Sequence, residues 1–201
     1  MIRVLLAEDQ GMVRGALAAL LRLEGDIEVV AEVARGDAIV STALQTQPDV
    51  ALLDIEMPGQ DGLSAAKALL EQLPSCRVVI LTTFGRSGYL RRAMESGVVG
   101  FLLKEASASQ LAVAIRRVME GDRVVDPELA LTALSEGVNP LTSREREILA
   151  IARSGASLAN IAAQLSLSEG TVRNHLSITI QKLGVRNRME AAYLAEQKGW
   201  L

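Results

Sequence analysis

The 201-residue sequence predicts an α/β domain built on a five-stranded, doubly wound parallel sheet, followed by a small all-α helix-turn-helix domain. Short apolar runs alternate five times with segments of helical period in residues 1–120, whereas residues 141–201 contain helical patterns only. Residues 121–140 carry two prolines and two glycines, so we interpret them as a linker with room for one short helix.

Charge supports the same division. Residues 141–201 hold eight Lys or Arg and five Asp or Glu, a net of +3, although the whole chain has a net charge of −3. Residues 1–140 therefore carry a net of −6. An acidic first part and a basic second part indicate two tasks, with any polyanionic partner bound by the second part.

Five short apolar runs are the predicted strands. They cover residues 2–7, 28–33, 49–54, 77–82 and 99–104. The third and fourth are continuously apolar, which is typical of strands covered on both faces of a parallel sheet. Helical periodicity is found between and after them, at residues 12–24, 37–46, 62–73, 87–96 and 107–121. Right-handed crossovers then place these helices on both faces of the sheet.

The second domain contains four consecutive helical patterns without a strand. They cover residues 141–155, 158–165, 168–184 and 188–199. Thr142 or Ser143, followed by an acidic residue, supplies a capping start to the first. Gly155, Gly184 and Gly199 provide stops.

Composition excludes several classes of protein. A chain with 49% hydrophobic and 22% charged residues is not expected to be disordered. Its single cysteine, Cys76, cannot form an internal disulfide and is predicted to be a buried thiol. The N-terminal apolar run is too short for a signal peptide, and no run reaches membrane-spanning length, so we expect a cytoplasmic protein.

Polar residues stand at the ends of four predicted strands: Glu8 and Asp9, Asp54, Thr82, and Lys104. Because ligands of parallel sheets lie at the carboxyl ends of the strands, these side chains are expected to share one pocket. Clustered carboxylates stay ionised only if a hard cation neutralises them, and oxygen ligands suit Mg²⁺. The sequence therefore predicts a magnesium site.

This group of side chains also suits phosphoryl transfer. Asp54 would accept the phosphoryl group, the Glu8–Asp9 pair would hold Mg²⁺, and Lys104 and Thr82 would donate hydrogen bonds.

Residues 1–120 resemble a response-regulator receiver domain. The resemblance rests on A-E-D at the first strand, D-x-x-M-P-x-x-D-G from Asp54 to Gly62, L-T-T at the fourth strand and F-L-L-K-E at the fifth. Two positions depart from the common pattern. Glu8 stands where aspartate is commoner, and Glu105 follows Lys104 where many relatives have proline.

The resemblance implies roles for particular residues. Asp54 is phosphorylated by a sensor histidine kinase, and Mg²⁺ is bound by Glu8, Asp9, Asp54 and the main-chain carbonyl of Glu56. Thr82 then moves toward the phosphoryl group. Phe101, an aromatic residue three positions before Lys104, follows it inward, so the two residues form the expected switch.

The third helical pattern of the second domain has the features of a DNA-recognition helix. One apolar stripe lies at helical spacing: Val172, Leu176, Ile180 and Leu183. This stripe leaves polar residues on other faces, where Arg173, Asn174 and Ser177 suit contacts to bases. Thr171, Lys182 and Arg186 are predicted to reach phosphates.

The second domain resembles the four-helix DNA-binding domain of NarL/FixJ (LuxR-type) regulators. The stretches that carry the resemblance are L-T-S-R-E-R-E-I-L, T-V-R-N-H-L and K-L-G-V-R-N-R-M-E-A. It implies that Arg173, Asn174 and Ser177 face bases of double-stranded promoter DNA, and RNA polymerase is a candidate partner. Ser177 departs from the lysine or arginine of some relatives, so the operator sequence cannot be transferred.

Other stretches resemble the membrane-fluidity regulators of this family, among them A-E-D-Q, D-I-E-M-P-G and the ending K-G-W. This likeness implies a membrane-bound kinase and control of a fatty-acid desaturase or membrane-lipid genes. The expected mechanism is dimerisation on phosphorylation, which lets two helical domains bind two half-sites. We expect helices 12–24 and 107–119 to form the dimer face.

Three alternatives compete with a non-enzymatic response regulator. An aspartate-nucleophile phosphatase usually has a second acid two residues after the nucleophile. This chain has Glu56 at that position, which keeps the phosphatase alternative open. A dinucleotide-binding domain would need G-x-G-x-x-G after the first strand, which is absent. A phosphorylation-independent DNA-binding protein remains the third alternative.

Overall fold

The computed structural model describes residues 1–83, 87–135 and 139–201. Residues 84–86, between the fourth predicted strand and the helical segment 87–96, and residues 136–138 of the predicted linker lie outside the described residues. The chain divides into two compact units, one of Met1–Gly85 and Tyr89–Ala133 and one made mainly of Leu134–Leu201. Each unit is described by itself.

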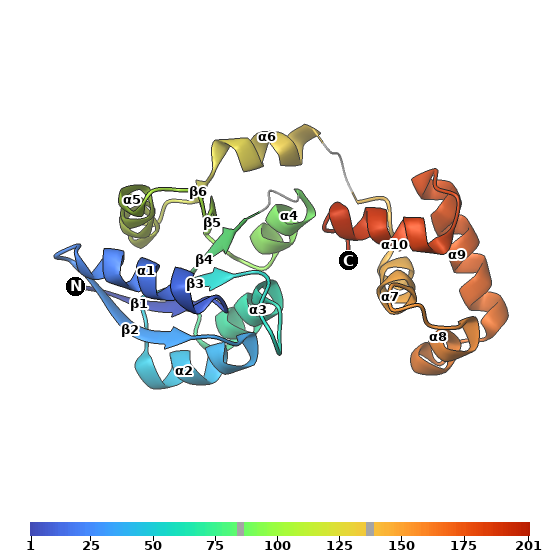
Figure 1. The fold of residues 1–201 in the computed structure, drawn as a ribbon, viewed down its shortest axis with the longest axis horizontal. Helices are drawn as coiled ribbons and strands as arrows, with labels where there is room; N and C mark the ends of the chain where they lie inside the picture. The colour runs from blue at the N-terminus through green and yellow to red at the C-terminus, as the bar shows by residue number, and fades with distance from the viewer. Residues whose placement is uncertain (84–86, 136–138) are drawn as a thin grey trace. The chain divides into compact units, whose positions relative to one another are not determined.

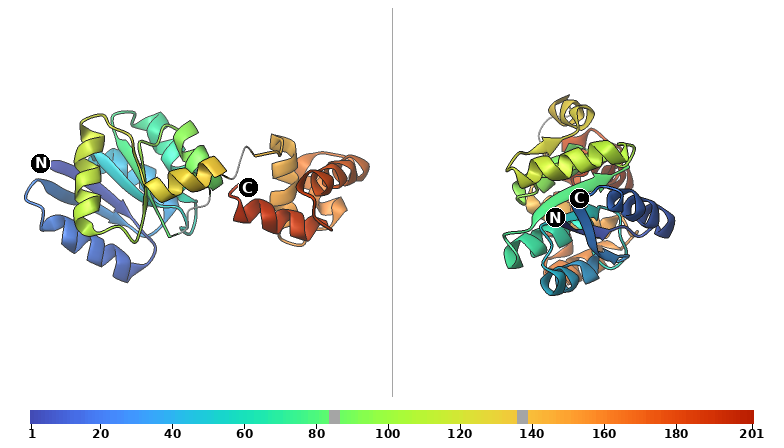
Figure 2. Two further views of the ribbon diagram at one scale, coloured as in Figure 1. Left: turned by 90° about the horizontal axis from the view of Figure 1, so that it is seen from above. Right: turned by 90° about the vertical axis from the view of Figure 1, so that its left-hand side faces the viewer.

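The first unit is built on a parallel sheet with the strand order β2-β1-β3-β4-β5-β6, whose neighbouring strands all run in the same direction (Figures 1 and 2). The strands are β1 Ile2–Ala7, β2 Ile27–Val33, β3 Val50–Asp54, β4 Arg77–Thr82, β5 Gly100–Leu103 and β6 Val124–Val125. The predicted α/β fold is confirmed. All five predicted strands are present, and the short β6 is an addition from the predicted linker.

Six α-helices accompany this sheet in the described part of the first unit. They are α1 Gly11–Arg22, α2 Ile39–Thr46, α3 Gly62–Gln72, α4 Ser87–Glu95, α5 Ala108–Met119 and α6 Pro127–Ser135. Local sequence sets two of their starts. The Asp61 side chain accepts hydrogen bonds from the backbone N–H groups of Leu63 and Ser64, and Ser107 forms a capping box with Gln110.

The strands supply two separate cores because successive side chains point to opposite faces of the sheet. Leu53 and Ile80 belong to the core under α2, α3 and α4, whereas their neighbours Leu52 and Val79 belong to the core under α1 and α5. This double burial explains why β3 and β4 are apolar at consecutive positions.

The β6–α6 segment packs against the edge of the sheet. The backbone N–H of Asp126 donates to the carbonyl of Phe101 at 2.9 Å, and the N–H of Val124 donates to Val99 at the same distance. Leu129 of α6 is 4% exposed and joins the core that contains Phe101. Residues in the predicted linker therefore complete the first unit.

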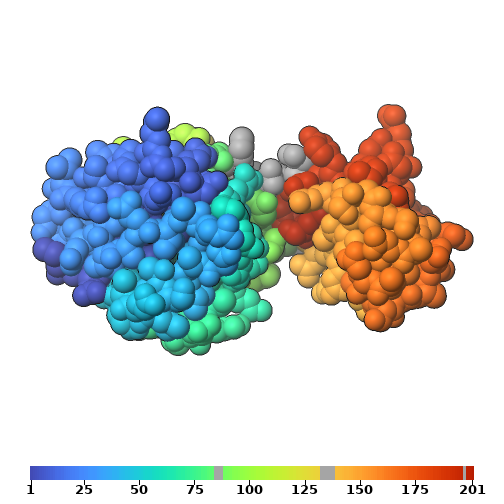
Figure 3. All heavy atoms as spheres, turned by 60° about the horizontal axis from the view of Figure 1, so that its bottom comes forward, coloured from blue at the N-terminus to red at the C-terminus, as the bar shows by residue number. Residues whose placement is uncertain are grey.

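The second unit is all-helical in its described residues, as predicted. Its helices are α7 Ser143–Ala152, α8 Leu158–Leu165, α9 Glu169–Leu183 and α10 Arg188–Gln197. They enclose one core, which includes Ile148 and Leu149 of α7, Ile161 of α8 and Leu176 of α9. In the space-filling view this unit is coloured orange to red, and blue to cyan atoms cover the near face of the first unit (Figure 3).

A tight turn joins α8 to α9. Ser166 adopts the left-handed conformation with φ of 53°, and the backbone N–H of Leu167 donates to the carbonyl of Ala162 at 2.9 Å. Ser168 then caps α9 by accepting from the N–H of Thr171 at 3.1 Å. Helix, tight turn and capped second helix form the predicted helix-turn-helix.

Candidate functional site

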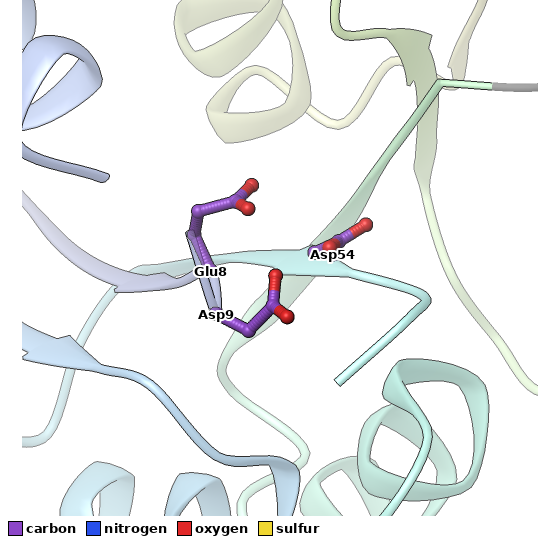
Figure 4. A group of neighbouring side chains, drawn as sticks. All are labelled: Glu8, Asp9 and Asp54. Atoms are coloured by element: carbon purple, nitrogen blue, oxygen red, sulfur yellow. The ribbon is translucent and has the colours of Figure 1, made fainter. Parts of the chain in front are cut away.

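The candidate site begins where β1 and β3 lie side by side. Ala7 pairs with Leu53 in the sheet, so the next residue on each strand, Glu8 and Asp54, reaches the same edge. Carboxylate oxygens of Glu8, Asp9 and Asp54 all lie within 4.8 Å of one another, and Figure 4 shows the three side chains gathered at these strand ends. The predicted acidic cluster is present in the structure.

Lys104 completes the cluster from the end of β5. Its backbone N–H donates to the carbonyl of Thr82 at 2.8 Å, which fixes the start of its side chain beside the end of β4. Its Nζ lies 2.7 Å from Oε2 of Glu8 and 2.9 Å from Oδ2 of Asp54. The structure therefore brings the residues at all four predicted strand ends together.

Burial governs the electrostatics of this cluster. Burial raises the pKa of Glu8, and the negative charge of Asp54 adds to that increase, while Lys104 opposes it. Burial acts to lower the pKa of Lys104, but its contacts with Glu8 and Asp54 outweigh that effect and raise it. Lys104 is therefore an ammonium that balances only one of the three carboxylates. The fully ionised group carries a net charge of −2.

The donor set fits a divalent cation. Oε1 of Glu8 accepts a hydrogen bond from the backbone N–H of Gln10 at 3.2 Å. Oε2 is buried and has the Lys104 ammonium at ion-pair distance, but no hydrogen bond of suitable direction among the described residues. A buried carboxylate oxygen with spare acceptor capacity, beside two further carboxylates, is the ligand chemistry that Mg²⁺ prefers.

Two glycines shape the loop after Asp54. The N–H of Gly62 donates to the carbonyl of Ile55 at 2.9 Å, and a side-chain carbon at position 62 would overlap the carbonyl oxygen of Asp54. Gly36 donates to Pro58 at 3.1 Å, and a side chain there would overlap the backbone of Gln60. The role of Gly36 was missed; its only sequence signal is a glycine shortly after a predicted strand.

Arg14 of α1 is a second residue that sequence reasoning missed. Its Nη1 donates to the main-chain carbonyl of Glu8 at 2.6 Å and so holds the end of β1 against α1. No motif marks this contact, because it joins a side chain to a backbone oxygen six positions earlier.

The remaining predicted residues of this site differ in burial. Thr82 is 4% exposed and Phe101 is fully buried in the core under α2, α3 and α4. Glu56 is exposed two residues after Asp54. The movement of Thr82 and Phe101, and the ligand role of the Glu56 carbonyl, stay predictions.

The predicted recognition helix is α9. Its apolar stripe packs in the core of the second unit, and Thr179, which the stripe did not include, is 1% exposed. The four residues predicted to touch DNA from its N-terminal part are exposed: Thr171, Arg173, Asn174 and Ser177. Their contacts with DNA stay predictions.

The two cations predicted to reach phosphates from the end of α9 are placed differently. Arg186 is exposed. The Nζ of Lys182 lies 2.7 Å and 2.8 Å from the two carboxylate oxygens of Glu145 in α7. Lys182 is therefore engaged in an ion pair within its own unit.

Comparison with known families agrees with this fold and site. Residues 4–116 match the response regulator receiver domain, and residues 139–195 match the bacterial regulatory proteins of the luxR family. The chain belongs to the two-component response regulators of the NarL/LuxR type, which control transcription and are not enzymes. The phosphatase alternative is thereby excluded.

Individual relatives cover the whole chain. It is 48% identical over 200 residues to the transcriptional regulatory protein DesR of Bacillus subtilis, covering 100% of this chain and 99% of that protein. It is 46% identical over 201 residues to the uncharacterized transcriptional regulatory protein YvfU of the same species, covering all of both chains. The likeness to particular members of this family that the sequence stretches suggested is a likeness to DesR.

Solved structures show the same fold. The crystal structure of the response regulator ChrA of a heme-sensing two-component system matches with a TM-score of 0.59 and 38% identity, covering 100% of this chain and 98% of that one. An RcsB–DNA complex matches with a TM-score of 0.67 at 23% identity, covering 96% and 98%, and shows the fold alone. Among the described helices, none has the length and hydrophobicity needed to cross a membrane.

Proposed function

We propose that this response regulator is switched by phosphorylation of Asp54, with a sensor histidine kinase as the phosphoryl donor. One observation carries the proposal: Lys104 bridges Glu8 and Asp54 at 2.7 Å and 2.9 Å, beside a further carboxylate from Asp9. An acceptor carboxylate beside a fixed ammonium and a pair of metal-ligating acids is an arrangement suited to phosphoryl transfer.

In the proposed step, a carboxylate oxygen of Asp54 attacks the phosphorus of a phosphohistidine on the kinase. A P–O bond forms as the P–N bond breaks, and the histidine nitrogen leaves with the electron pair. Glu8, Asp9, Asp54 and the main-chain carbonyl of Glu56 would hold Mg²⁺, which supplies charge neutralisation at the phosphoryl oxygens when bound. Lys104 exchanges its contact with Asp54 for one with the phosphoryl group, and Thr82 donates its hydroxyl.

The output is proposed to be dimerisation followed by binding to promoter DNA. Phosphorylation would shift Thr82 and Phe101, favour pairing of the first units through α1 and α5, and let two second units bind two half-sites. Two linked domains bind more tightly than one, because the second binding event becomes intramolecular. Another solved structure with this fold contains two RcsB dimers bound to two parallel DNAs, and that assembly of RcsB supports the same mode here.

The similarity to DesR supports a narrower assignment. We propose that the kinase is membrane-bound, that this chain acts in the cytoplasm, and that its targets include a fatty-acid desaturase or other membrane-lipid genes, read by RNA polymerase. Measuring the desaturase transcript in strains with and without the gene that encodes this chain would test the proposed targets.

The switch is tested by light scattering with and without Mg²⁺ and beryllofluoride, a phosphoryl mimic. We expect the wild-type chain to change from monomer to dimer when both are present. Asp54→Ala, which lacks the acceptor oxygens, should stay monomeric under the same conditions. A molar mass that changes neither with beryllofluoride nor with the Asp54→Ala substitution would contradict the dimerisation mechanism. It would favour a phosphorylation-independent DNA-binding protein.

A further inference from the structure

Glu145 is a buried carboxylate at the start of α7, 3% exposed and hydrogen-bonded at both oxygens. The two oxygens accept from Nζ of Lys182 at 2.7 Å and 2.8 Å, and Oε2 also accepts from the backbone N–H of Thr142 at 2.8 Å. Burial alone would raise the pKa of Glu145, but these hydrogen bonds outweigh it and lower the pKa. This carboxylate is therefore ionised and fixed in place.

Its partner Lys182 lies in the last turn of α9, 37 residues further along the chain. The pair therefore fixes the C-terminal end of the predicted recognition helix to the N-terminal turn of α7. The N-terminal half of α9 is held separately by Val172 and Leu176, which are buried in the core of the second unit. With both ends held, the exposed residues between them keep one orientation relative to the core.

Lys182 also points away from Arg173, one of the three residues that are predicted to face bases. Arg173 and Lys182 are nine positions apart, which at 3.6 residues per turn places them on roughly opposite sides of α9. For Lys182 to reach a phosphate, its ammonium would have to leave Glu145 as a buried, uncompensated charge. Although the Lys182 side chain is 35% exposed, Glu145 is 3% exposed, so removing the ammonium leaves a buried carboxylate without its cation, which is costly.

We infer that Lys182 is a positioning residue for DNA recognition and not a phosphate ligand: its ion pair with Glu145 sets the orientation of α9. This inference rests on the proposed DNA binding through α9 and replaces the phosphate contact that the sequence alone suggested for Lys182. The ion pair is internal to the second unit and is formed in the absence of DNA.

The salt dependence of binding separates the two roles. The full chain, activated with Mg²⁺ and beryllofluoride, is titrated onto a short random-sequence DNA duplex at KCl concentrations from about 50 to 200 mM. Removing one phosphate ligand reduces the slope of log affinity against log salt concentration by about one. We expect Lys182→Met to leave this slope unchanged, and the exposed control Arg186→Met to reduce it.

The positioning role of Lys182 is tested by how strongly the chain discriminates between two DNA sequences. A duplex selected by the wild-type chain from a randomised pool is compared with the random duplex. We expect Lys182→Met to lower this affinity ratio about tenfold or more, the range for one mispositioned base contact, and Lys182→Arg to restore most of it. The double variant Glu145→Gln with Lys182→Met should lose no more than the single variant, because the two residues act as one unit.

The inference can be tested even if the Lys182→Met variant fails to fold. The double variant leaves no buried unpaired charge, so it supplies a folded comparison if Lys182→Met unfolds, as circular dichroism would show. A reduced slope for Lys182→Met, or an unchanged discrimination ratio, would overturn the inference alone. A wild-type chain that does not bind the random duplex and selects no sequence from the pool would overturn the proposed DNA binding and this inference with it.

Discussion

At the scale of single residues, Glu8 shows that ionising the site lowers the stability of the folded chain. A glutamate that is 1% exposed and lies beside Asp54 is harder to ionise than one in water, and Lys104 offsets only part of that cost. The folded state therefore binds a proton at Glu8 more readily than the unfolded chain does. The same cost is what a bound divalent cation would relieve.

Glu8→Gln is expected to stabilise the folded chain in the absence of metal. Because the folded-state pKa of Glu8 is raised, its favourable contribution is complete below the unfolded value near 4.5 and is lost as pH rises through the folded value. The variant avoids this loss, so its thermal midpoint at pH 7 should be higher by on the order of a few degrees. The difference should shrink as the pH falls toward 4.5.

Calorimetry across this pH range tests the prediction, with the exposed residue change Glu28→Gln as a control that should leave the midpoint unchanged. A Glu8→Gln variant less stable than wild type at pH 7 would show that the Lys104 ion pair outweighs burial. Excess Mg²⁺ should reverse the order, because the variant loses a metal ligand.

At the scale of elements, the loop between β3 and α3 is the least tolerant part of the site. Gly62 starts α3 so close to the end of β3 that a side-chain carbon there would overlap the backbone of Asp54. Glycine thus lets the chain turn quickly from the acceptor residue into a helix, with Asp61 as the cap.

Gly62→Ala is expected to destabilise the chain by about 1–3 kcal/mol, because the added carbon has no room without moving the backbone of Asp54. The matched control is Gly15→Ala in α1, where nothing lies within 4 Å of the added carbon. There the better helix propensity of alanine should stabilise by up to about 1 kcal/mol. Urea denaturation measures both, and equal effects at the two glycines would refute the steric explanation.

Elements of the fold could be predicted to different degrees. The five long strands and the strand-end site follow from apolar runs that end in or beside polar residues, together with the rule that parallel strands present these ends at one edge. Strand β6 could not be found, because two valines give no periodicity. The Glu145–Lys182 pair was equally hidden, since a contact across 37 residues leaves no local pattern.

At the scale of the whole molecule, the extent of the first unit matters for where the chain can be divided. The predicted receiver domain, 1–120, stops before β6 and α6, although Leu129 is 4% exposed within the core of that unit. The position of the boundary is a proposal that fragments can test.

A fragment of residues 1–133 is expected to be more stable than a fragment of residues 1–120. Burying one leucine side chain contributes about 1.5–3 kcal/mol, and the shorter fragment also exposes the edge of β5. Urea denaturation of both fragments measures the difference. Within the longer one, Leu129→Ala should remove most of it, whereas Leu131→Ala, at a residue 67% exposed, should change little. Equal stability of the two fragments would place the boundary at 120.

The division of the sheet into two cores has a further consequence. Val79 and Ile80 are neighbours in the chain, yet each packs under a different set of helices, and the backbone of the sheet separates them. A change in the volume of one side chain is then answered by helices on its own face only. Over evolutionary time, substitutions under α1 and α5 can therefore accumulate independently of substitutions under α2, α3 and α4. One face of the sheet can acquire a new partner while the packing of the other face is inherited unchanged.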